Sequence, residues 1–306
     1  RPVVYDNLSR GHEEFVKWGP LERGDVRDLD RLLQVMRAHR PAVVLHFAAL
    51  AYVAESFVQP QHYYGINVGG TATVLDAMRL GGCRHIVFSS SCASYGVPLR
   101  PLILESDTQQ PISPYGTSKF FAERVIAESA NAHRLTWIAL RYFNAAGADA
   151  DLEIGEWHDP EPHVLPRLIG TALGPGGGRP FEVLGGDHAT ADGSCVRDYV
   201  HVEDLARAHV AAVSDLLAGG LSAPINLGNG RGVSVFELLR AVESVTGRRI
   251  ESVVAPRRPG DPPAAVADAS LAASRLGWRP RRPDIHQIID SAVRWHRHRP
   301  ETLSDV

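Results

Sequence analysis

The sequence of 306 residues lacks several features that would assign it to common functional classes. Its three cysteines, Cys83, Cys92 and Cys195, form no Cys-x-x-Cys pair, so they indicate neither a disulfide framework nor a zinc site, and we predict no metal-binding residue. The sequence has no apolar run of about 18 residues and no basic-then-apolar leader, which predicts a cytoplasmic protein without membrane contact. A formal charge of −3 argues against nucleic-acid binding, since such binding needs a basic surface.

A glycine-rich phosphate-binding turn is also absent. A dinucleotide-binding fold opens with a strand and a G-x-x-G-x-x-G turn, whose backbone amides hold a pyrophosphate. Here residues 2–6 already have the pattern of a strand, and a turn follows at Asp6. We expect either that the chain is truncated at its start by about thirty residues, the length of one βαβ step that would carry this opening unit, or that it lacks the usual grip on a cofactor. We favour the first alternative, because the absent strand would be the central one of the sheet and would leave its neighbours unpaired.

What is present is an alternation of strand-like and helix-like segments, which predicts an α/β fold with a doubly wound parallel sheet. Short apolar runs typical of buried strands occur at residues 2–6, 43–47, 85–88, 136–142 and 225–228. Apolar residues at helical spacing predict helices over residues 28–39, 60–80, 114–132, 203–217 and 234–246.

Tyr115 and Lys119 carry the strongest chemical signal. They lie four residues apart in a predicted helix and therefore share one helix face. A phenol normally titrates near pH ~10, and a neighbouring ammonium lowers its pKa, so the pair suits proton transfer at a sugar or alcohol hydroxyl. Alone, such a pair is most often ordinary helix surface. Here the hydroxyls of Ser89–Ser91 follow a predicted strand, at the edge where α/β sheets bind ligands.

Two acidic residues also follow predicted strands. Asp6 is placed to accept hydrogen bonds from the ribose hydroxyls of a dinucleotide, and its charge would repel a 2′-phosphate, which favours NAD over NADP. A turn or a helix cap is the alternative role for Asp6 and Asn7. We expect residues 24–26 to begin the next helix, so an N-cap is the alternative role for Asp25.

Several segments share the order and spacing of one family. They are His46–Ala49, Phe88–Ser91, Ser113–Lys119, Arg141–Gly147, Val196–His201 and Arg257–Asp261. On these segments the chain, from residue 6 to residue 295, resembles the UDP-glucose 4-epimerase family of the extended short-chain dehydrogenase/reductase superfamily. The resemblance implies a Rossmann-type sheet that lacks its first strand.

The resemblance also implies a reaction, a cofactor and a substrate. A sugar 4-hydroxyl would be oxidised to a ketone and then reduced on the opposite face, which interconverts UDP-glucose and UDP-galactose with NAD as the bound cofactor. Tyr115 would be the base, and Ser91 would share a short hydrogen bond to O4. Lys119 would hold the nicotinamide ribose and lower the pKa of Tyr115.

The family's binding positions map onto this sequence residue by residue. The cofactor positions are Asp6, Asn7, Asp25, Val26, Phe47, Ala48, Ala49, Asn67, Ser89, Tyr115, Lys119 and Tyr142. The substrate positions are Ser91, Phe143, Asn144, His163, Val164, Leu184, Arg197, Arg258, Asp261 and Ala265. The two arginines would bind the UDP diphosphate, because a guanidinium group binds phosphate oxygens in pairs. These positions also have alternative roles that involve no ligand. Residues 47–49 could simply pack at a strand end, Asn67 could lie at the surface, and the arginines could form surface ion pairs.

The same resemblance divides the chain into two domains. An NAD-binding domain would comprise residues 1–144, with residues 195–230 and 283–300 returning to it. A smaller α/β substrate domain would comprise residues 145–194 and 231–282, where prolines and the run 174–178 indicate loops. The predicted helices 60–80 and 114–132 are the candidates for a homodimer interface.

Three positions depart from the pattern of many members. Ala51 replaces a lysine near the cofactor phosphates, which removes one cation. His163 replaces an asparagine, and histidine can also donate a hydrogen bond. Ala265 stands at a position that is bulky in members restricted to glucose and galactose. A small side chain there predicts room for a 2-acetamido group, and therefore turnover of UDP-GlcNAc and UDP-GalNAc.

Three other functions remain alternatives. A sugar-nucleotide 4,6-dehydratase places acids directly after the active-site hydroxyl, whereas Cys92 and Ala93 follow Ser91 here. A decarboxylase is disfavoured less strongly, since it reuses the tyrosine and lysine. A non-catalytic dinucleotide-binding protein would be free to lose Ser91, Tyr115 and Lys119, which are all present, but the absent glycine-rich turn keeps this alternative open.

Overall fold

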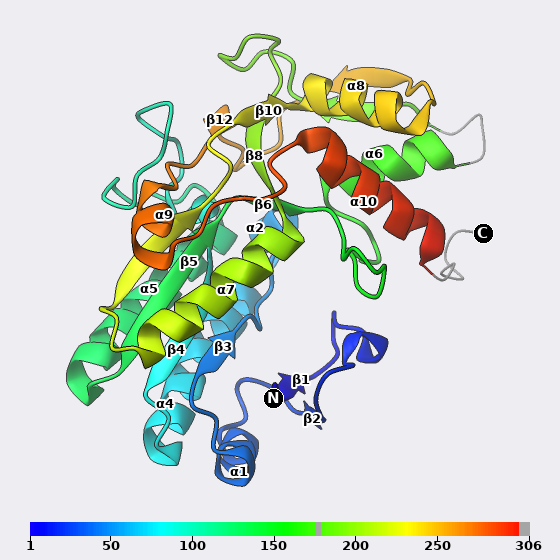
Figure 1. Ribbon diagram of the computed structural model, residues 1–306. Coiled ribbons are helices and arrows are strands. Elements are labelled where there is room, and N and C mark those ends of the chain that lie inside the picture. The colour runs from blue at the N-terminus through cyan, green and yellow to red at the C-terminus, as the bar shows by residue number, and fades with distance from the viewer. Residues whose placement is uncertain (175–178, 300–306) are drawn as a thin grey trace.

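A four-stranded parallel sheet forms the centre of the larger half of the molecule (Figure 1). The structure, a computed structural model, describes residues 1–174 and 179–299. The sheet order is β3-β4-β5-β9, and adjacent strands are parallel. Its strands are β3 (Val44–His46), β4 (His85–Ser91), β5 (Thr136–Tyr142) and β9 (Ala223–Leu227). The predicted α/β fold with a parallel, Rossmann-type sheet is confirmed.

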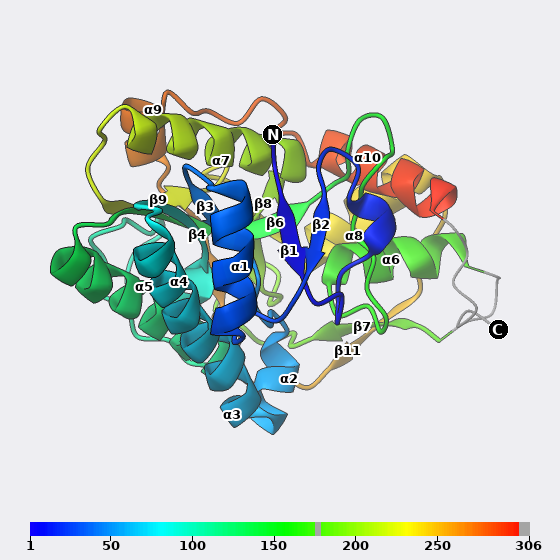
Figure 2. The same cartoon turned by 90° about the horizontal axis from the view of Figure 1, so that it is seen from below.

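Helices cover both faces of this sheet (Figure 2). On one face lie α1 (Leu29–His39), α4 (Thr71–Gly81) and α5 (Pro114–His133), and on the other lie α7 (Val202–Leu217) and α9 (Ser270–Leu276). Successive residues of a strand point to opposite faces, so in β4 Ile86 and Phe88 pack in the first layer and Val87 packs in the second. This burial on both faces explains why the strands are continuous apolar runs in the sequence.

The first two strands form a sheet of their own. β1 (Val4–Asp6) pairs in parallel with β2 (Leu21–Arg23), and neither pairs with β3. The outer edge of β3 therefore has no partner among the described residues, and beside it Leu45 and Phe47 are 44% and 52% exposed. The predicted unpaired place in the sheet is confirmed.

Residues 53–81 form consecutive helices, and a stretch with wider, π-helical turns lies between them. It contains α2 (Val53–Val58), α3 (Pro60–Tyr63), a π-helical stretch (Tyr64–Gly70) and α4. The prediction of one regular helix over 60–80 was therefore wrong in detail. The prediction that residues 24–26 begin a helix was also wrong, because Asp28 is the N-cap of α1 and accepts a hydrogen bond from the Arg31 amide.

The smaller half contains a second sheet, in which β8 (Val196–His201) pairs with β6 (Asn144–Ala146), β10 (Gly232–Ser234) and β12 (Ala264–Ala265). A parallel pair, β7 (Phe181–Leu184) and β11 (Ser252–Ala255), lies beside it. The helices α6 (Val164–Leu173), α8 (Val235–Thr246) and α10 (Ile285–His298) share one apolar core. Short 3₁₀ turns occur at Glu13–Phe15 and Cys92–Ser94.

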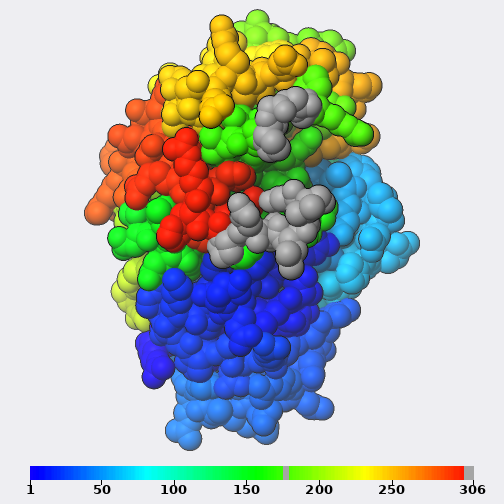
Figure 3. Space-filling view, turned by 90° about the vertical axis from the view of Figure 1, so that its right-hand side faces the viewer, coloured from blue at the N-terminus to red at the C-terminus, as the bar shows by residue number. Residues whose placement is uncertain are grey.

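The packing of α9 and α10 differs from the predicted domain boundaries. Residues 283–300 were assigned to the cofactor domain, but α10 packs on α6 and α8 and lies at the surface there (Figure 3). Residues 231–282 were assigned to the substrate domain, but α9 packs in the core beneath α7 and β9. The other boundaries stay a prediction, and residues 175–178 and 300, which these boundaries include, lie outside the described residues. Within the described ranges, no helix has both the length and the apolar character needed to cross a bilayer.

Candidate active site

A cavity of about 870 Å³ opens at the carboxyl ends of β3, β4 and β5, between the central sheet and the smaller half. Parallel sheets bind ligands at this edge. Most of the predicted site residues line the cavity. They are Phe47, Ala49, Ser89, Ser91, Tyr115, Lys119, Tyr142, Phe143, Asn144, His163, Val164, Leu184, Arg197, Arg258, Asp261 and Ala265.

The start of α5 positions Tyr115 and Lys119. The Ser113 side chain accepts a hydrogen bond from the Gly116 amide, and Pro114 occupies the first turn, which is a favourable helix start. A Cβ on Gly116 would lie 2.4 Å from the Ala93 carbonyl oxygen, so only glycine lets the helix approach the turn after Ser91. The residue between the two reactive side chains thus sets their distance from the end of β4.

Lys119 is buried, and its Nζ donates a hydrogen bond to the Ser89 carbonyl oxygen at 2.7 Å. It also lies 4.9 Å from the centre of the Phe88 ring. Burial lowers the pKa of Lys119 from its usual 10.5 to about 7, which the Glu123 carboxylate partly opposes. This lysine is therefore poised to change its charge near neutral pH.

Tyr115 does not show the electrostatic effect that the sequence predicted. Burial raises the pKa of Tyr115 above its usual range, a hydrogen bond with Ser91 opposes the rise, and Tyr142 and Cys92 add to it. The expected lowering by Lys119 is absent, so that prediction was wrong for the protein as the structure shows it. The physical reason is that burial disfavours the charged phenolate, while the lysine ammonium is engaged by a backbone carbonyl oxygen.

The three serines at the end of β4 divide between two environments. Ser89 and Ser91 face the cavity, whereas Ser90 points to the opposite side and donates a short hydrogen bond to Glu123. This alternation follows from the period of two in a strand. Ser89 Oγ also makes a short hydrogen bond with the Tyr142 hydroxyl, which joins the ends of β4 and β5.

A buried polar network under the cavity was not predicted from the sequence. Arg141 forms an ion pair with Glu123 at 2.5 Å, and its Nη1 donates to the Tyr95 hydroxyl at 2.9 Å. Tyr95 in turn donates to Asn226 Oδ1 at 2.7 Å. The signal was available, because charged residues inside a buried strand and on the inner face of a helix need partners. The network holds α5, β5 and β9 in fixed relation under the reactive side chains.

At the other end of the cavity, Asp261 holds two guanidinium groups. Arg258 binds both of its oxygens at 2.9 Å, and Arg197 lies 3.3 Å away. Arg197 also donates to the Pro262 carbonyl oxygen at 2.8 Å. Two cations share one anion here, so the cluster keeps a net positive charge that suits a phosphate group.

Six predicted cofactor residues do not line the cavity. Asp6 Oδ1 accepts a hydrogen bond from the Leu8 amide, so Asp6 has the turn role given above as its alternative. Asp25 forms an ion pair with Arg27 at 2.7 Å and accepts a hydrogen bond from Asn7 at 3.2 Å. The others are Val26, which packs on the core beside α1, and Ala48 and Asn67.

The buried side chain of Asn67 has a clear structural task. It accepts a hydrogen bond from the Leu50 amide at 2.8 Å and donates to the Leu50 carbonyl oxygen and to Ser118. The alternative that Asn67 lies at the protein surface is therefore wrong. Asn67 holds the loop after β3 against α5 from outside the cavity.

The donor groups of the cavity fit the cofactor that the sequence predicts. Tyr115, Lys119 and the Ser89–Tyr142 pair gather hydroxyl and amine groups at one end of a mostly apolar cavity, which suits the ribose hydroxyls and flat ring of a nicotinamide nucleotide. The small side chain of Ala49 beside them leaves room for close approach.

Comparisons with known proteins identify the family of the chain. The profile of the NAD dependent epimerase/dehydratase family matches residues 3–228. A UDP-glucose 4-epimerase of Rhizobium leguminosarum bv. trifolii is 50% identical over 296 residues, which are 97% of this chain and 90% of that protein. The crystal structure of a UDP-glucose 4-epimerase from Brucella ovis in complex with NAD is 49% identical, with a TM-score of 0.91 over 96% of this chain and 90% of that one. The UDP-glucose 4-epimerase structure from Bifidobacterium longum in complex with NAD+ and UDP is 34% identical, with a TM-score of 0.89 over 97% of this chain and 90% of that one.

Proposed function

Because the chain belongs to the NAD dependent epimerase/dehydratase family, we infer that it is an NAD-dependent UDP-sugar 4-epimerase that interconverts UDP-glucose and UDP-galactose. The observation that carries this conclusion is the identity of 50% to a UDP-glucose 4-epimerase over 97% of the chain. The cavity adds chemical support, since Ser91, Tyr115 and Lys119 all line it.

We propose that Tyr115 reacts as the phenolate, whose oxygen accepts the proton of the substrate 4-hydroxyl and later returns a proton to O4. A positively charged nicotinamide ring beside it would favour this ionised form, which burial alone disfavours. Ser91, which is hydrogen bonded to Tyr115, would hold O4 during both transfers. NAD, when bound, supplies a positively charged ring that takes a hydride from C4 and gives it back. Lys119 would bind the ribose of the cofactor, and its pKa of about 7 lets its charge respond to that binding.

Arg197 and Arg258 would bind the diphosphate of the UDP-sugar. Support comes from their position on the cavity wall and from Asp261, which fixes both guanidinium groups in place before any anion arrives. Fixed donors lose little freedom on binding, so they bind a phosphate more tightly than mobile ones. Phe143, Asn144, Val164 and Leu184 would line the remaining substrate pocket.

A coupled assay tests this function against its rivals. The protein is supplied with NAD and UDP-galactose, and formation of UDP-glucose is followed with UDP-glucose dehydrogenase. We expect sustained turnover without net consumption of NAD. A 4-keto-6-deoxy sugar instead would show a dehydratase, and release of CO₂ from UDP-glucuronate would show a decarboxylase. Binding of NAD without any of these products would show a non-catalytic protein.

We further propose that UDP-GlcNAc and UDP-GalNAc are substrates. The support is Ala265, a buried alanine on the cavity wall, where a methyl side chain leaves space beside the substrate. We expect wild-type protein to turn over UDP-GalNAc, and Ala265→Tyr to lose that activity while retaining activity on UDP-galactose. Absence of UDP-GalNAc turnover in an active wild-type enzyme would refute this proposal.

We also propose a cytoplasmic homodimer that pairs through the helices of residues 60–81 and α5. Phe121 on α5 is an exposed aromatic residue, and the rings of Tyr64 and Phe120 lie beside it, which forms an apolar face suited to a second copy. Light scattering should give a dimer for the wild type and a monomer for Phe121→Glu. The cytoplasmic location agrees with three cysteines that remain free thiols.

A further inference from the structure

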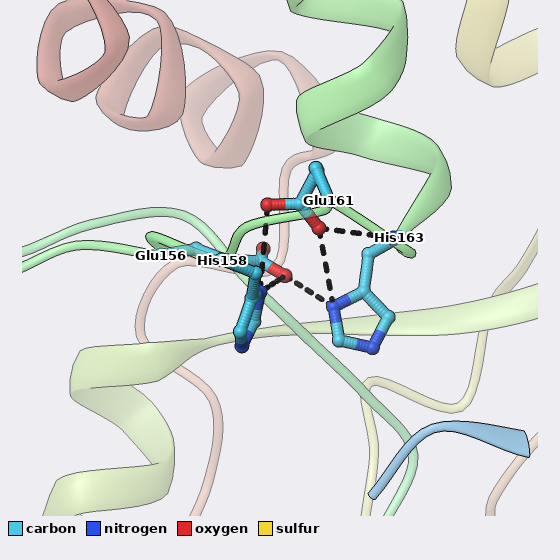
Figure 4. Close-up of side chains that lie close together, drawn as sticks. All are labelled: Glu156, His158, Glu161 and His163. Carbon is cyan, nitrogen blue, oxygen red and sulfur yellow. Dashed lines mark hydrogen bonds and ion pairs between the residues drawn. The ribbon is translucent and has the colours of Figure 1, made fainter. Parts of the chain in front are cut away.

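Four metal-ligating side chains meet in the loop that joins β6 to α6. Glu156, His158, Glu161 and His163 lie within eight residues of chain, and their donor atoms all lie within 4.8 Å of one another. Figure 4 shows both carboxylates and both imidazole rings turned toward a common centre. No metal ligand was predicted here, although the sequence has the pattern E-x-H-x-x-E-x-H.

Several distances between these donor atoms are close to those around a small tetrahedral cation. His158 Nδ1 lies 3.4 Å from Glu156 Oε1 and 3.4 Å from Glu161 Oε2, and His163 Nδ1 lies 3.7 Å from Glu161 Oε1. Zinc binds imidazole nitrogen and carboxylate oxygen at ~2.1 Å, so the ligand atoms of a tetrahedral site are about 3.4 Å apart. His163 and Glu156 are hydrogen bonded to each other and would have to separate.

Two of the donor atoms are buried and have ion pairs as their contacts. Among the described residues, His158 Nδ1 and Glu161 Oε2 are buried polar atoms that make no well-aligned hydrogen bond, and they lie 3.4 Å from each other. Buried polar atoms without a well-formed hydrogen bond call for an ion or a water. A cation at the centre of the cluster would satisfy both atoms at once.

The loop that carries the ligands is held firmly on both sides. Trp295 Nε1 donates to the Glu156 carbonyl oxygen at 2.9 Å, and the Trp157 ring stacks on His12 with centres 4.4 Å apart. The Tyr52 ring meets His158 and His163 edge-on, with centres 5.5 and 6.3 Å away. Such support keeps ligands oriented before the metal arrives, which strengthens binding.

We propose that Glu156, His158, Glu161 and His163 bind one divalent transition-metal ion of the zinc type. Two imidazole nitrogens favour such an ion over magnesium or calcium, which take oxygen ligands in larger number. The ion would fix the loop at the rim of the cavity, since Glu156, His158 and His163 also line that cavity. This inference does not rest on the proposed function, because it concerns the ligands alone.

The rival explanation is an ion-pair cluster in which a proton takes the place of the metal. Burial lowers the pKa of His158, but the carboxylates of Glu156 and Glu161 outweigh burial and raise that pKa to about 9. A protonated His158 would then balance the acidic side chains at neutral pH. A metal-binding measurement separates the two explanations, because only the first predicts a defined stoichiometry.

Cobalt(II) is a suitable probe, because its visible absorption is strong in four-coordinate sites and weak in six-coordinate ones. Full-length protein is freed of metal with a chelator, the chelator is removed, and cobalt is titrated in. We expect one ion per chain, a strong four-coordinate spectrum and its loss when zinc is added. A weak six-coordinate spectrum, or no binding, would overturn the proposal even if no variant folds.

Variants assign the ion to these ligands. We expect His158→Gln and Glu161→Gln to weaken cobalt binding at least tenfold, and zinc to raise the melting temperature of the wild type but not of these variants. The matched control is His298→Gln, at the exposed end of α10 in the histidine-rich run of the C-terminal helix. If His298→Gln removes the ion and His158→Gln does not, the bound metal belongs to that helix and the proposed site is wrong.

Discussion

Lys119 and Arg258 are both basic side chains on the wall of the same cavity, but their surroundings differ. Lys119 is buried at the sheet end, and its hydrogen-bond partner is an uncharged carbonyl oxygen. Arg258 lies at the opposite end, partly exposed, with both oxygens of Asp261 at 2.9 Å. Burial lowers the pKa of Lys119 to about 7, so its charge is conditional. One end of the cavity therefore suits proton transfer, and the other suits binding of a fixed anion.

The largest effect is expected from Tyr115→Phe, which removes the proposed base at the proton-transfer end. We expect kcat for UDP-galactose to fall about 10³-fold, within the usual range for general acid–base catalysis, while KM changes little. The coupled assay provides both constants. Tyr64→Phe is the control, since Tyr64 does not line the cavity and should keep full activity. If Tyr115→Phe had a normal kcat, Tyr115 would not be the base of the reaction.

Lys119→Met should stabilise the protein without cofactor at neutral pH. The unfolded lysine has a pKa near 10.5 and the folded one about 7, so the unfolded chain binds more protons between these values. Wild-type stability therefore rises as the pH increases from 7 to 10.5, and below 7 the full cost of the buried charge applies. We expect Lys119→Met to raise the free energy of unfolding by about 2 kcal/mol at pH 7, after loss of the Ser89 hydrogen bond, with no gain near pH 10.5.

Urea unfolding at several pH values measures this difference. The exposed Lys17→Met serves as the matched control, because Lys17 is a surface residue that faces Glu153. A constant difference between Lys119→Met and wild type across this pH range would show that the buried lysine does not titrate as described.

At the end of the cavity that suits an anion, Arg258→Gln should weaken binding of the UDP-sugar. A hydrogen bond to a charged group contributes about 1.5–3 kcal/mol, so we expect KM for the UDP-sugar to rise tenfold to hundredfold with kcat nearly unchanged. Arg257→Gln is the neighbouring control, since Arg257 pairs with Asp187 and does not line the cavity. If Arg258→Gln lowered kcat and left KM intact, the contrast between the two ends would be lost.

The smallest effect is expected from Ser91→Ala. Burial raises the pKa of Tyr115 and the Ser91 hydroxyl opposes that rise, so the variant should raise the pKa further. Because the pKa of Tyr115 lies above pH 9 in both proteins, a further rise lowers the phenolate fraction by the same factor at pH 6 and at pH 9. We expect a loss of kcat/KM of about tenfold that is equal at the two pH values. A loss that differed between pH 6 and pH 9 would contradict this role of Ser91.

Much of the fold could be predicted from the sequence, because strand burial and helix caps are local signals. The runs 85–88 and 136–142 became β4 and β5, and the alternation of strands with helices gave the parallel sheet. The wide turn at residues 64–70 could not be predicted in this way, because its apolar residues fit an ordinary helix equally well. The packing of α9 and α10 depends on contacts between distant segments, which local patterns do not contain.

The residues of the candidate site also divide into those that local sequence patterns predicted and those that depend on contacts between distant segments. Spacing placed Tyr115 and Lys119 on one helix face, and both line the cavity. The pKa of Tyr115 could not be predicted, because it depends on burial and on neighbours from other strands. The partners of Arg141 and the cluster around His158 also come together only in three dimensions, where buried charges must find each other.

The π-helical stretch between α3 and α4 has a consequence for sequence variation. Loss of one codon within residues 64–70 would leave a regular helix of acceptable composition, and a comparison of sequences would show only a gap of one residue. Because a π-helical turn contains one residue more than an α-helical turn, that deletion would tighten the turn without the rotation of about 100° that a deletion within an ordinary α-helix causes. The Tyr63 hydroxyl would therefore stay near the Tyr52 carbonyl oxygen, 2.8 Å away at present, and the cavity wall at Tyr52 would keep its anchor.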